Sequence, residues 1–509
     1  MSYLTDKLVQ QMHSADRPVV EEAGCWHTAG ALRRRIEHIQ RMMAAAGIKP
    51  GDRVLLGLPN SYAFLCCFLA IIDAGAVVAT INPQLTATEF KQFIRRCHPT
   101  AAFVLAPHAR ILLQDDPDRT LRALFTYHDQ TIECHERKAG RWSSAAQRDE
   151  LAYAGFAAPA EDAIAVLLYT SGTTGAPKAV GLSHRQIAAA ARHIIHSHRL
   201  NAADRAYNIL PLFHINAQVV TVLSTLLSGG QIVMAPKFSA SCFWDTIAHE
   251  EITWVSAVPA IIAILLKIPR PAVIPETLRF IRSASAPLEE RLAVQFEDRF
   301  GIPLIQSYGM TEAASQICVN PLPPKMRKLA SVGFPYGLQL KIVNDSDESL
   351  PCGQPGEIVI RGENVIDHYI DGAGEDAFQN GWFHTGDVGY VDEDGYVYIV
   401  GRQKELINRG GEKISPYEVE QVIRMVPGVQ QVAVIGLSDP QYGEKVAAFI
   451  VTETKDQQVS RQIKQAVVRQ CRRLLSPQKQ PAVIETVDAV PTGPTGKVQR
   501  SLLKKRLFV

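Results

Sequence analysis

The stretch that decides how the chain is interpreted is Leu168-Tyr169-Thr170-Ser171-Gly172-Thr173-Thr174-Gly175-Ala176-Pro177-Lys178. An apolar run over residues 163–168 predicts a buried strand, and a helix is expected from about Ser183. The loop between them suits a phosphate group, because glycines let backbone N–H groups approach an anion and hydroxyls add donors. The candidate phosphate-binding residues are Thr170, Ser171, Gly172, Thr173, Thr174, Gly175 and Lys178, with an ordinary surface turn as the alternative. A Walker A motif is excluded, because the position where it requires glycine holds Pro177.

Composition excludes several classes of protein. The chain has 509 residues and 47% hydrophobic content, enough for a large core and for two to four domains. Its net charge of +2, without a long run of like charges, does not indicate a nucleic-acid partner. Nine cysteines without a C-x-x-C pair indicate reduced thiols and a cytoplasmic location. We expect no signal peptide and no membrane span, because the most apolar segment, residues 62–72, is about half the length that a bilayer requires.

Alternating helices and strands predict parallel sheets that are covered on both faces. The first set comprises helices at 29–46 and 62–72 and strands at 53–58, 76–81 and 101–105. The second comprises strands at 205–209, 231–234 and 254–258 and helices at 217–227, 243–249 and 260–266. We assign no element to the polar residues 110–148. Both sets together predict two doubly wound α/β layers.

The last third of the chain changes character. Glycine-punctuated short strands over residues 331–400 predict a small β-barrel-like subdomain or sheet. The tail of about 110 residues is long enough for a domain of its own. The expected fold is α/β, with a large N-terminal domain at 1–401 and a small C-terminal α+β domain at 402–509.

The pattern Tyr-Thr-Ser-Gly-Thr-Thr-Gly-x-Pro-Lys at residues 169–178 closely resembles the signature of the adenylate-forming superfamily. This superfamily includes acyl-CoA synthetases, aryl-CoA ligases, adenylation domains and firefly-type luciferases. Further motifs of the superfamily follow in the same order along residues 169–500. The resemblance implies that the C-terminal domain is a mobile lid, which reorients between two half-reactions.

A second motif, Gln306-Ser307-Tyr308-Gly309-Met310-Thr311-Glu312, follows the apolar strand at 302–305 and resembles the superfamily's adenine-binding segment. The resemblance implies that Tyr308 stacks on adenine, that Thr311 contacts phosphate and that Glu312 holds Mg²⁺. A flat aromatic face suits a purine, and a hard carboxylate oxygen suits magnesium. The alternative is a plain strand-to-helix turn with Thr311 as its cap. Upstream, Ser285-Ala286-Pro287 resembles the short loop on the adenine side.

Three later motifs complete the predicted ATP site. Asp387 lies in a segment that resembles the Thr-Gly-Asp motif, whose carboxylate accepts hydrogen bonds from both ribose hydroxyls. Residues 401–407 resemble the motif that places Arg402 on ATP and Lys404 at the hinge of the lid. The loop at 491–500 resembles the one that carries the catalytic lysine, here Lys497, which neutralises charge between the acid and the α-phosphate. A turn aspartate and a solvated lysine are the plain alternatives for Asp387 and Lys497.

The resemblance implies a two-step reaction that uses ATP, Mg²⁺ and CoA. A carboxylic acid first gives acyl-AMP and pyrophosphate, and a nucleophile then displaces AMP. Residues 408–416 resemble acyl-CoA synthetases, in which the pair Gly410 and Gly411 lets the CoA arm approach the backbone. CoA is therefore the expected acceptor. A carrier-protein thiol or an amine is the alternative acceptor, and a non-catalytic nucleotide sensor is less favoured because the charged site residues keep competent side chains.

The acid itself is expected to be a small non-amino carboxylic acid. Residues 211–218 occupy the acyl-pocket motif of the superfamily and contain His214, which we place with Thr311, Glu312 and Lys497 among the catalytic residues. Amino-acid-activating members carry an aspartate in this motif, and this chain has none. Asn216 and Gln218 either bind a polar acyl group or cap the following helix. Residues 238–245 look like carnitine- or crotonobetaine-type ligases and residues 408–416 like oxalate-type ligases, so the acid stays open.

Overall fold

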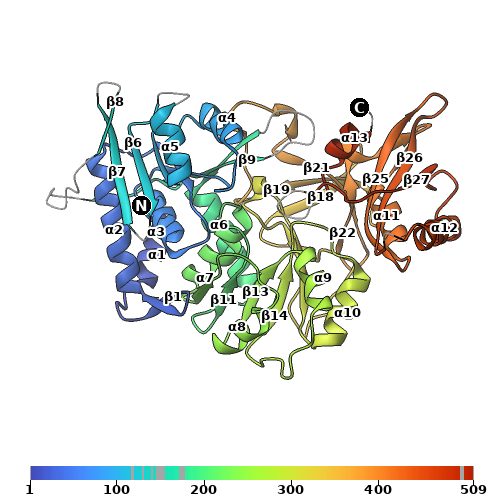
Figure 1. The fold of residues 1–509 in the computed structure, drawn as a ribbon, viewed down its shortest axis with the longest axis horizontal. Coiled ribbons are helices and arrows are strands. Elements are labelled where there is room, and N and C mark those ends of the chain that lie inside the picture. Colours follow the sequence, from blue (N-terminus) through green and yellow to red (C-terminus); the bar gives the residue numbers. More distant parts are fainter. Residues whose placement is uncertain are drawn as a thin grey trace.

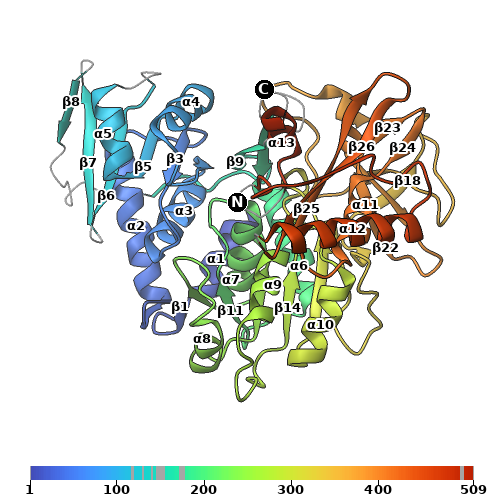
Figure 2. The same cartoon turned by 45° about the vertical axis from the view of Figure 1, so that its right-hand side comes forward.

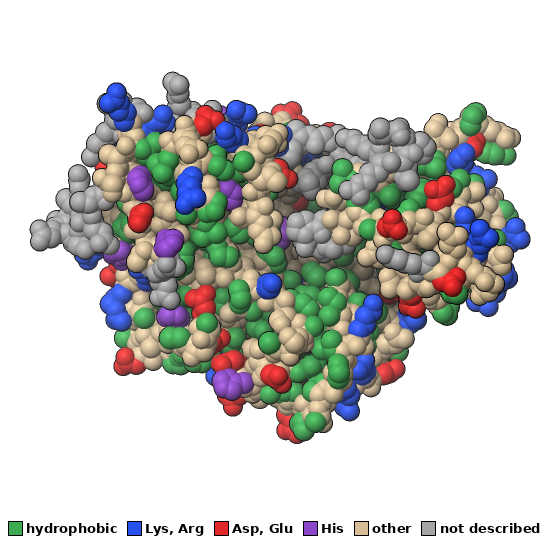
Figure 3. Space-filling view, viewed as in Figure 1, with side chains coloured by type: hydrophobic (Ala, Val, Ile, Leu, Met, Phe, Trp, Pro, Cys, Tyr) green, Lys and Arg blue, Asp and Glu red, His purple; other side chains and the backbone are tan. Residues whose placement is uncertain are grey.

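The computed structural model describes residues 2–115, 120–128, 131–138, 141–144, 155–170, 178–454, 456–492 and 498–507. Two large sheets with helices against them form most of the molecule, and a third sheet leads to a small domain at one end (Figure 1). The small domain stays beside the third sheet when the view is turned (Figure 2). On the face in Figure 3, acidic and basic side chains are interspersed rather than gathered by sign.

The first sheet has the strand order β10-β9-β4-β3-β5-β6-β7-β8, with a parallel centre and antiparallel ends. Its strands are β3 (Arg53–Gly57), β4 (Val77–Thr80), β5 (Ala101–Leu105), β6 (Ala123–His128), β7 (Thr131–Lys138), β8 (Arg141–Ser144), β9 (Ile164–Thr170) and β10 (Lys178–Ser183). The accompanying helices are α2 (Ala29–Ala45), α3 (Tyr62–Asp73), α4 (Ala87–Cys97) and α5 (Ala106–Gln114). Helix α3 is almost wholly apolar and buried, and the Ser61 side chain caps its first turn.

The second sheet has the order β17-β16-β15-β14-β13-β11-β12-β1-β2 and is parallel from β15 to β1. Its strands are β1 (Pro18–Glu22), β2 (Cys25–Thr28), β11 (Arg205–Asn208), β12 (Gln231–Met234), β13 (Trp254–Ala257), β14 (Phe280–Ser283), β15 (Leu304–Tyr308), β16 (Cys318–Val319) and β17 (Phe334–Pro335). The helices are α1 (Tyr3–Gln11), α6 (His184–His198), η1 (Asn216–Leu223), α7 (Ser224–Leu227), α8 (Phe243–His249), α9 (Pro259–Lys267), α10 (Glu290–Phe300) and the short turn η2 (Thr311–Ala313). One continuous apolar core joins both large sheets.

The third sheet follows the order β18-β19-β21-β20, with β22 paired to β21. Its elements are β18 (Gln339–Val343), β19 (Gly356–Arg361), η3 (Glu375–Ala377), β20 (Phe378–Gln379), β21 (Trp382–Val391) and β22 (Val397–Arg402). After η4 (Gln403–Glu405), the small domain builds its own sheet and its own core. Its elements are β23 (Ile407–Arg409), β24 (Glu412–Ile414), α11 (Pro416–Arg424), β25 (Val429–Asp439), β26 (Gly443–Thr452), α12 (Gln457–Leu474), β27 (Val483–Thr486) and α13 (Arg500–Leu507).

This architecture confirms the predicted α/β class, with its large N-terminal part and smaller C-terminal domain. The structure also adds elements that the sequence did not indicate. Residues 110–148, which received no element, contain most of α5 and the strands β6 to β8. The helix expected over residues 217–227 begins as the wide-turned η1, a π-type helix, before α7. Among the described residues, no helix is long and apolar enough to cross a membrane.

Candidate active site

Asp387 joins the third sheet to the adenine motif. It lies on β21, is 4% exposed and accepts a hydrogen bond from the Tyr308 hydroxyl, with 2.6 Å between Oη and Oδ2. Its other oxygen, Oδ1, lies 2.9 Å from Nε of Arg402, which is opposite Asp387 in the β21–β22 ladder. Burial, reinforced by the Asp387 charge, raises the pKa of Tyr308, so its hydroxyl stays protonated and donates. Three predicted nucleotide-binding residues are therefore brought into direct contact.

Glu312 lies in η2 and forms a second group with two residues far along the chain. It is 7% exposed, and burial raises the pKa of its carboxyl group. The Tyr369 hydroxyl donates to Glu312 Oε1 at 3.1 Å, and Lys178 Nζ lies 4.5 Å from the centre of the Tyr369 ring. Tyr369 thus connects the end of the phosphate-loop stretch with the predicted magnesium ligand. A buried carboxylate is chemically suited to Mg²⁺ bound with a triphosphate, and the magnesium role of Glu312 stays a prediction.

Backbone packing explains the glycine of the adenine motif. A Cβ atom at Gly309 would lie 1.4 Å from the carbonyl oxygen of Ser315, so no other residue fits there. The close contact folds η2 back against β15 and fixes Thr311 at its start, with Met310 just before it. No side-chain hydrogen bond caps this turn, so the capping role that we considered for Thr311 is not seen. Gln306 and Ser307, on β15, are both buried.

The acyl-pocket motif contains a neutral histidine. Burial lowers the pKa of His214 to about 4, so its imidazole is uncharged at neutral pH. His214 is not hydrogen-bonded to any of the other predicted catalytic residues in the described part of the chain. As a neutral ring it can donate or accept one hydrogen bond, but it cannot serve as a cation for an acid.

The two amides of this motif have different environments. Gln218 is 1% exposed and donates to Thr80 Oγ1 at 3.0 Å and to the Leu212 carbonyl at 2.8 Å, which fastens the motif to β4. Asn216 donates from Nδ2 to Ser285 Oγ at 3.1 Å and accepts at Oδ1 from Arg282 at 3.2 Å. Within the described chain neither amide bonds to the helix backbone, so the capping alternative is not seen. A polar acyl contact of either amide stays a prediction.

The loop after β14 turns sharply at its first predicted residue. Ser285 is exposed and has a φ of 71°, in a region that side chains other than glycine seldom occupy. Ala286 and Pro287 continue the loop. The hydrogen bond that Asn216 donates to Ser285 places this adenine-side loop next to the acyl-pocket motif, so the two predicted subsites adjoin.

The predicted C-terminal domain begins with Arg402, and further predicted site residues follow it. Lys404 is exposed in η4, directly after Arg402 and Gln403. Gly410 and Gly411 form the turn between β23 and β24 with φ values of 63° and 92°, which a tight hairpin requires. The glycine pair thus has a local structural reason, and its contact with CoA stays a prediction. Ser171, Gly172, Thr173, Thr174, Gly175 and Lys497 lie outside the described residues. Thr170 and Lys178 flank the loop and are paired in the β9–β10 ladder.

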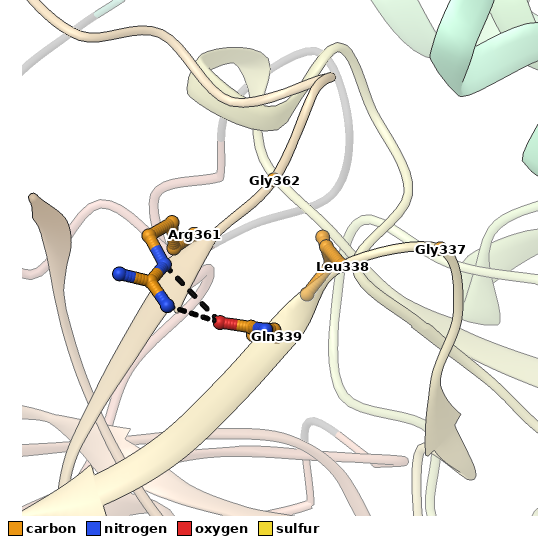
Figure 4. A pocket seen from close by; sticks show the side chains of 5 residues that line it. All are labelled: Gly337, Leu338, Gln339, Arg361 and Gly362. Carbon is orange, nitrogen blue, oxygen red and sulfur yellow. Dashed lines mark hydrogen bonds between the residues drawn. The ribbon is translucent and has the colours of Figure 1, made fainter.

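Two residues in these groups were not among the predicted site residues. Tyr369 follows an irregular stretch that contains no superfamily motif that we used, and Arg282 lies inside a short strand. Their positions become evident only from contacts between distant segments. A pocket of about 500 Å³ also opens beside β18 and β19, where Arg361 donates to Gln339 Oε1 from Nε at 3.1 Å and from Nη2 at 2.6 Å (Figure 4). It contains none of the predicted site residues, so we assign it no part in the reaction.

Comparison with known proteins gives matches over almost the whole chain. The AMP-binding enzyme family matches residues 9–370, and the AMP-binding enzyme C-terminal domain matches residues 418–497. The chain is 37% identical to sulfoacetate–CoA ligase of Cupriavidus necator, over 95% of this chain and 94% of the relative. It is 36% identical to oxalate–CoA ligase of Arabidopsis thaliana, over 92% and 91% of the two chains. The crystal structure of ATP-bound MatB from Rhodopseudomonas palustris superimposes with a TM-score of 0.88 at 28% identity, covering 99% of each chain.

Proposed function

The chain belongs to the AMP-binding enzyme family, and from this membership we propose that it is an AMP-forming acid:CoA ligase. The observation that carries the proposal is the contact of Tyr308, Asp387 and Arg402, which provides an aromatic face, a carboxylate and a guanidinium in one place. Relatives named as ligases of sulfoacetate and of oxalate support CoA as the acceptor and a small acid as the substrate.

In the first half-reaction, a carboxylate oxygen of the acid attacks the α-phosphorus of ATP, and the bond to pyrophosphate breaks. Tyr308 faces the adenine, Asp387 accepts from the ribose hydroxyls, and Arg402 lies beside the ribose and phosphates. Lys178, Thr311 and the loop from Thr170 to Gly175 hold the phosphates. Glu312 would hold Mg²⁺, which would balance charge on the triphosphate. Lys497 neutralises the charge that develops between acid and phosphate.

In the second half-reaction, the thiol sulfur of CoA attacks the acyl carbon, and AMP leaves with the electrons of the acyl–phosphate bond. The lid turns at Lys404 and brings Gly410 and Gly411 to the CoA arm. The similarity to an ATP-bound structure over the full chain supports assigning the present lid orientation to the first half-reaction.

The test is a panel of carboxylic acids incubated with ATP, Mg²⁺ and CoA, with products identified by mass spectrometry. We expect acid-dependent exchange of pyrophosphate into ATP, and AMP release that requires CoA. Asp387→Asn is the matched variant, because it keeps the shape of the side chain but removes its charge. We expect its rate of pyrophosphate exchange to be lower by about 10². Exchange without CoA-dependent AMP release would instead support transfer to a carrier-protein thiol or an amine. No exchange with any acid would overturn the enzyme assignment.

A further inference from the structure

Arg282 is a buried cation on β14 whose hydrogen-bond partners are all neutral. It is 1% exposed, and no carboxylate of the described chain lies within ion-pair distance of it. Its Nη1 donates to Asn216 Oδ1 and to Ser256 Oγ, each at 3.2 Å, and its Nη2 donates to Ser307 Oγ at 2.9 Å. Burying a charge without a counter-ion is strongly unfavourable, so packing alone does not account for an arginine here.

A neighbouring arginine has the counter-ion that Arg282 lacks. Arg279, three residues earlier, lies 2.7 Å from the carboxylate of Asp204. Nε has no partner in either arginine among the described residues, so the two differ in the counter-ion, which Arg279 has in Asp204 and Arg282 lacks. Burial lowers the pKa of Arg282 to about 9, so the guanidinium is still charged at neutral pH. The charge therefore persists beside the predicted acyl pocket.

Asn216 connects Arg282 with the exposed Ser285 through hydrogen bonds. A guanidinium can only donate, so Asn216 must turn its oxygen toward Arg282 and its NH₂ group away from it. That NH₂ group donates to Ser285 Oγ at 3.1 Å, and Ser285 is exposed. The three residues thus form a polar line from a buried positive charge to the rim of the acyl-pocket motif. Ser285 Oγ accepts from Asn216, so its own hydroxyl hydrogen is turned away from Asn216 and can be donated to an anionic group of a ligand.

We propose that Arg282, Asn216 and Ser285 form the recognition site for a second anionic group, so that the substrates are small acids with another carboxylate or a sulfonate. This inference rests on the proposed ligase function. The reacting carboxylate loses its charge when it becomes acyl-AMP, so a fixed cation bound to it would stabilise the substrate over the transition state. A second anionic group keeps its charge through both half-reactions, and it balances the Arg282 charge throughout.

The experiment compares acids that are matched in length. Malonate and sulfoacetate are compared with propionate, and oxalate is compared with acetate, with hexanoate and benzoate added as apolar acids. The readout is kcat/KM from CoA-dependent AMP release. We expect the acids with two anionic groups to exceed their single-charged partners by at least about 10²-fold. Equal or better use of the single-charged acids overturns this inference and leaves the ligase function standing, whereas no turnover of any acid overturns both.

Two variants separate charge recognition from a structural role. Arg282→Met removes the charge. Asn216→Asp places a carboxylate next to Arg282 and leaves the volume of this buried side chain almost unchanged. Each should lower the ratio of kcat/KM between double- and single-charged acids by about 10². Arg279→Met is the control and should leave the ratio unchanged, because Arg279 already has Asp204. If Arg282→Met fails to fold, the Asn216→Asp ratio decides. If a variant lowers kcat/KM by the same factor for both classes of acid, the inference is overturned.

Discussion

At the scale of single residues, Glu312 shows how a site group acts against the stability of its own fold. Burial raises its pKa, so between its ordinary pKa and the raised one the folded chain binds more protons than the unfolded chain. Its contribution to stability is therefore largest at low pH and is lost as the pH rises through the folded-state pKa. Keeping an ionisable carboxyl group at this buried position therefore serves the proposed metal binding at the expense of the free energy of unfolding.

We predict that Glu312→Gln raises the thermal midpoint at pH 8 by roughly 1 to 3 °C and changes it less at pH 5, because the amide carries no charge to bury. The same variant should need more Mg²⁺ for half-maximal pyrophosphate exchange. Scanning calorimetry at fixed scan rate checks the first outcome. Glu290→Gln, which changes an exposed glutamate on α10, is the control. An identical shift at both pH values would refute the role of the Glu312 charge.

We also predict that Lys497→Ala nearly abolishes acyl-AMP formation and leaves thioester synthesis from supplied acyl-AMP largely intact. Loss of a charge partner of the transition state costs roughly 10² to 10³ in rate. The two half-reactions are measured separately, by pyrophosphate exchange and by thioester formation. Equal losses in both would show that Lys497 does not act in the first half-reaction alone.

Sequence reasoning located some site residues and missed others for a physical reason. Tyr308, Asp387 and Arg402 each lie in a local motif, and the structure joins them. The importance of Arg282 depends instead on burial by Asn216, Ser256 and Ser307, which come from three other elements. No local spacing encodes that arrangement, because an arginine in a four-residue strand more often faces solvent.

At the scale of elements, the central parallel strands were predictable and the edge strands were not. β3, β5 and β12 are apolar runs between turn residues, and their predicted limits agree with the structure to within a residue. β7 lies toward the sheet edge and carries polar side chains on much of its length, so it lacks the apolar run of a central strand. The antiparallel pairing of β10 with β9 spans an intervening loop, which periodicity cannot detect.

The hinge prediction belongs to the same scale. Lys404 is the second residue of η4, a turn whose ordinary φ range suits proline in its first positions. Lys404→Pro should therefore keep pyrophosphate exchange within about threefold. Thioester formation should fall by about 10² or more, because the fixed φ resists reorientation of the lid. Lys404→Ala separates loss of the side chain from restriction of the backbone. Slowing of both half-reactions by the same factor in a normally folded Lys404→Pro variant would exclude the hinge.

At the scale of the whole molecule, the lid is fastened to the large domain by partly exposed ion pairs. Arg424 on α11 lies 3.5 Å from Glu289 at the start of α10, and Lys413 on β24 lies 3.3 Å from Asp345 after β18. Pairs of this kind contribute about 0 to 1 kcal/mol each and weaken in salt. Weak attachment agrees with the proposed reorientation of this domain between the two half-reactions.

We predict that Glu289→Gln lowers the rate of pyrophosphate exchange by up to about fivefold at low salt, because the present orientation loses its ion pair with Arg424. Thioester formation from supplied acyl-AMP should not slow. The difference should shrink at 0.5 M salt. Glu290→Gln, the adjacent exposed glutamate, is the matched control. If the two variants behave alike, the Arg424–Glu289 pair does not stabilise the orientation of the first half-reaction.

Both oxygens of Asp387 have partners in the protein itself, because Oδ2 accepts a hydrogen bond from Tyr308 and Oδ1 forms an ion pair with Arg402. When ATP binds, its ribose hydroxyls replace or share the donors that the chain already supplies to Asp387. A nucleotide that lacks one of these hydroxyls therefore leaves no unpaired charge on Asp387. We therefore expect little discrimination between sugars: in titration calorimetry, the Kd of 2′-deoxy-ATP should exceed that of ATP by less than about tenfold. A much larger penalty would mean that Tyr308 and Arg402 withdraw when the nucleotide binds. The ribose hydroxyls would share the carboxylate with these internal partners, so we expect nucleotide choice to depend mainly on the base and the phosphates.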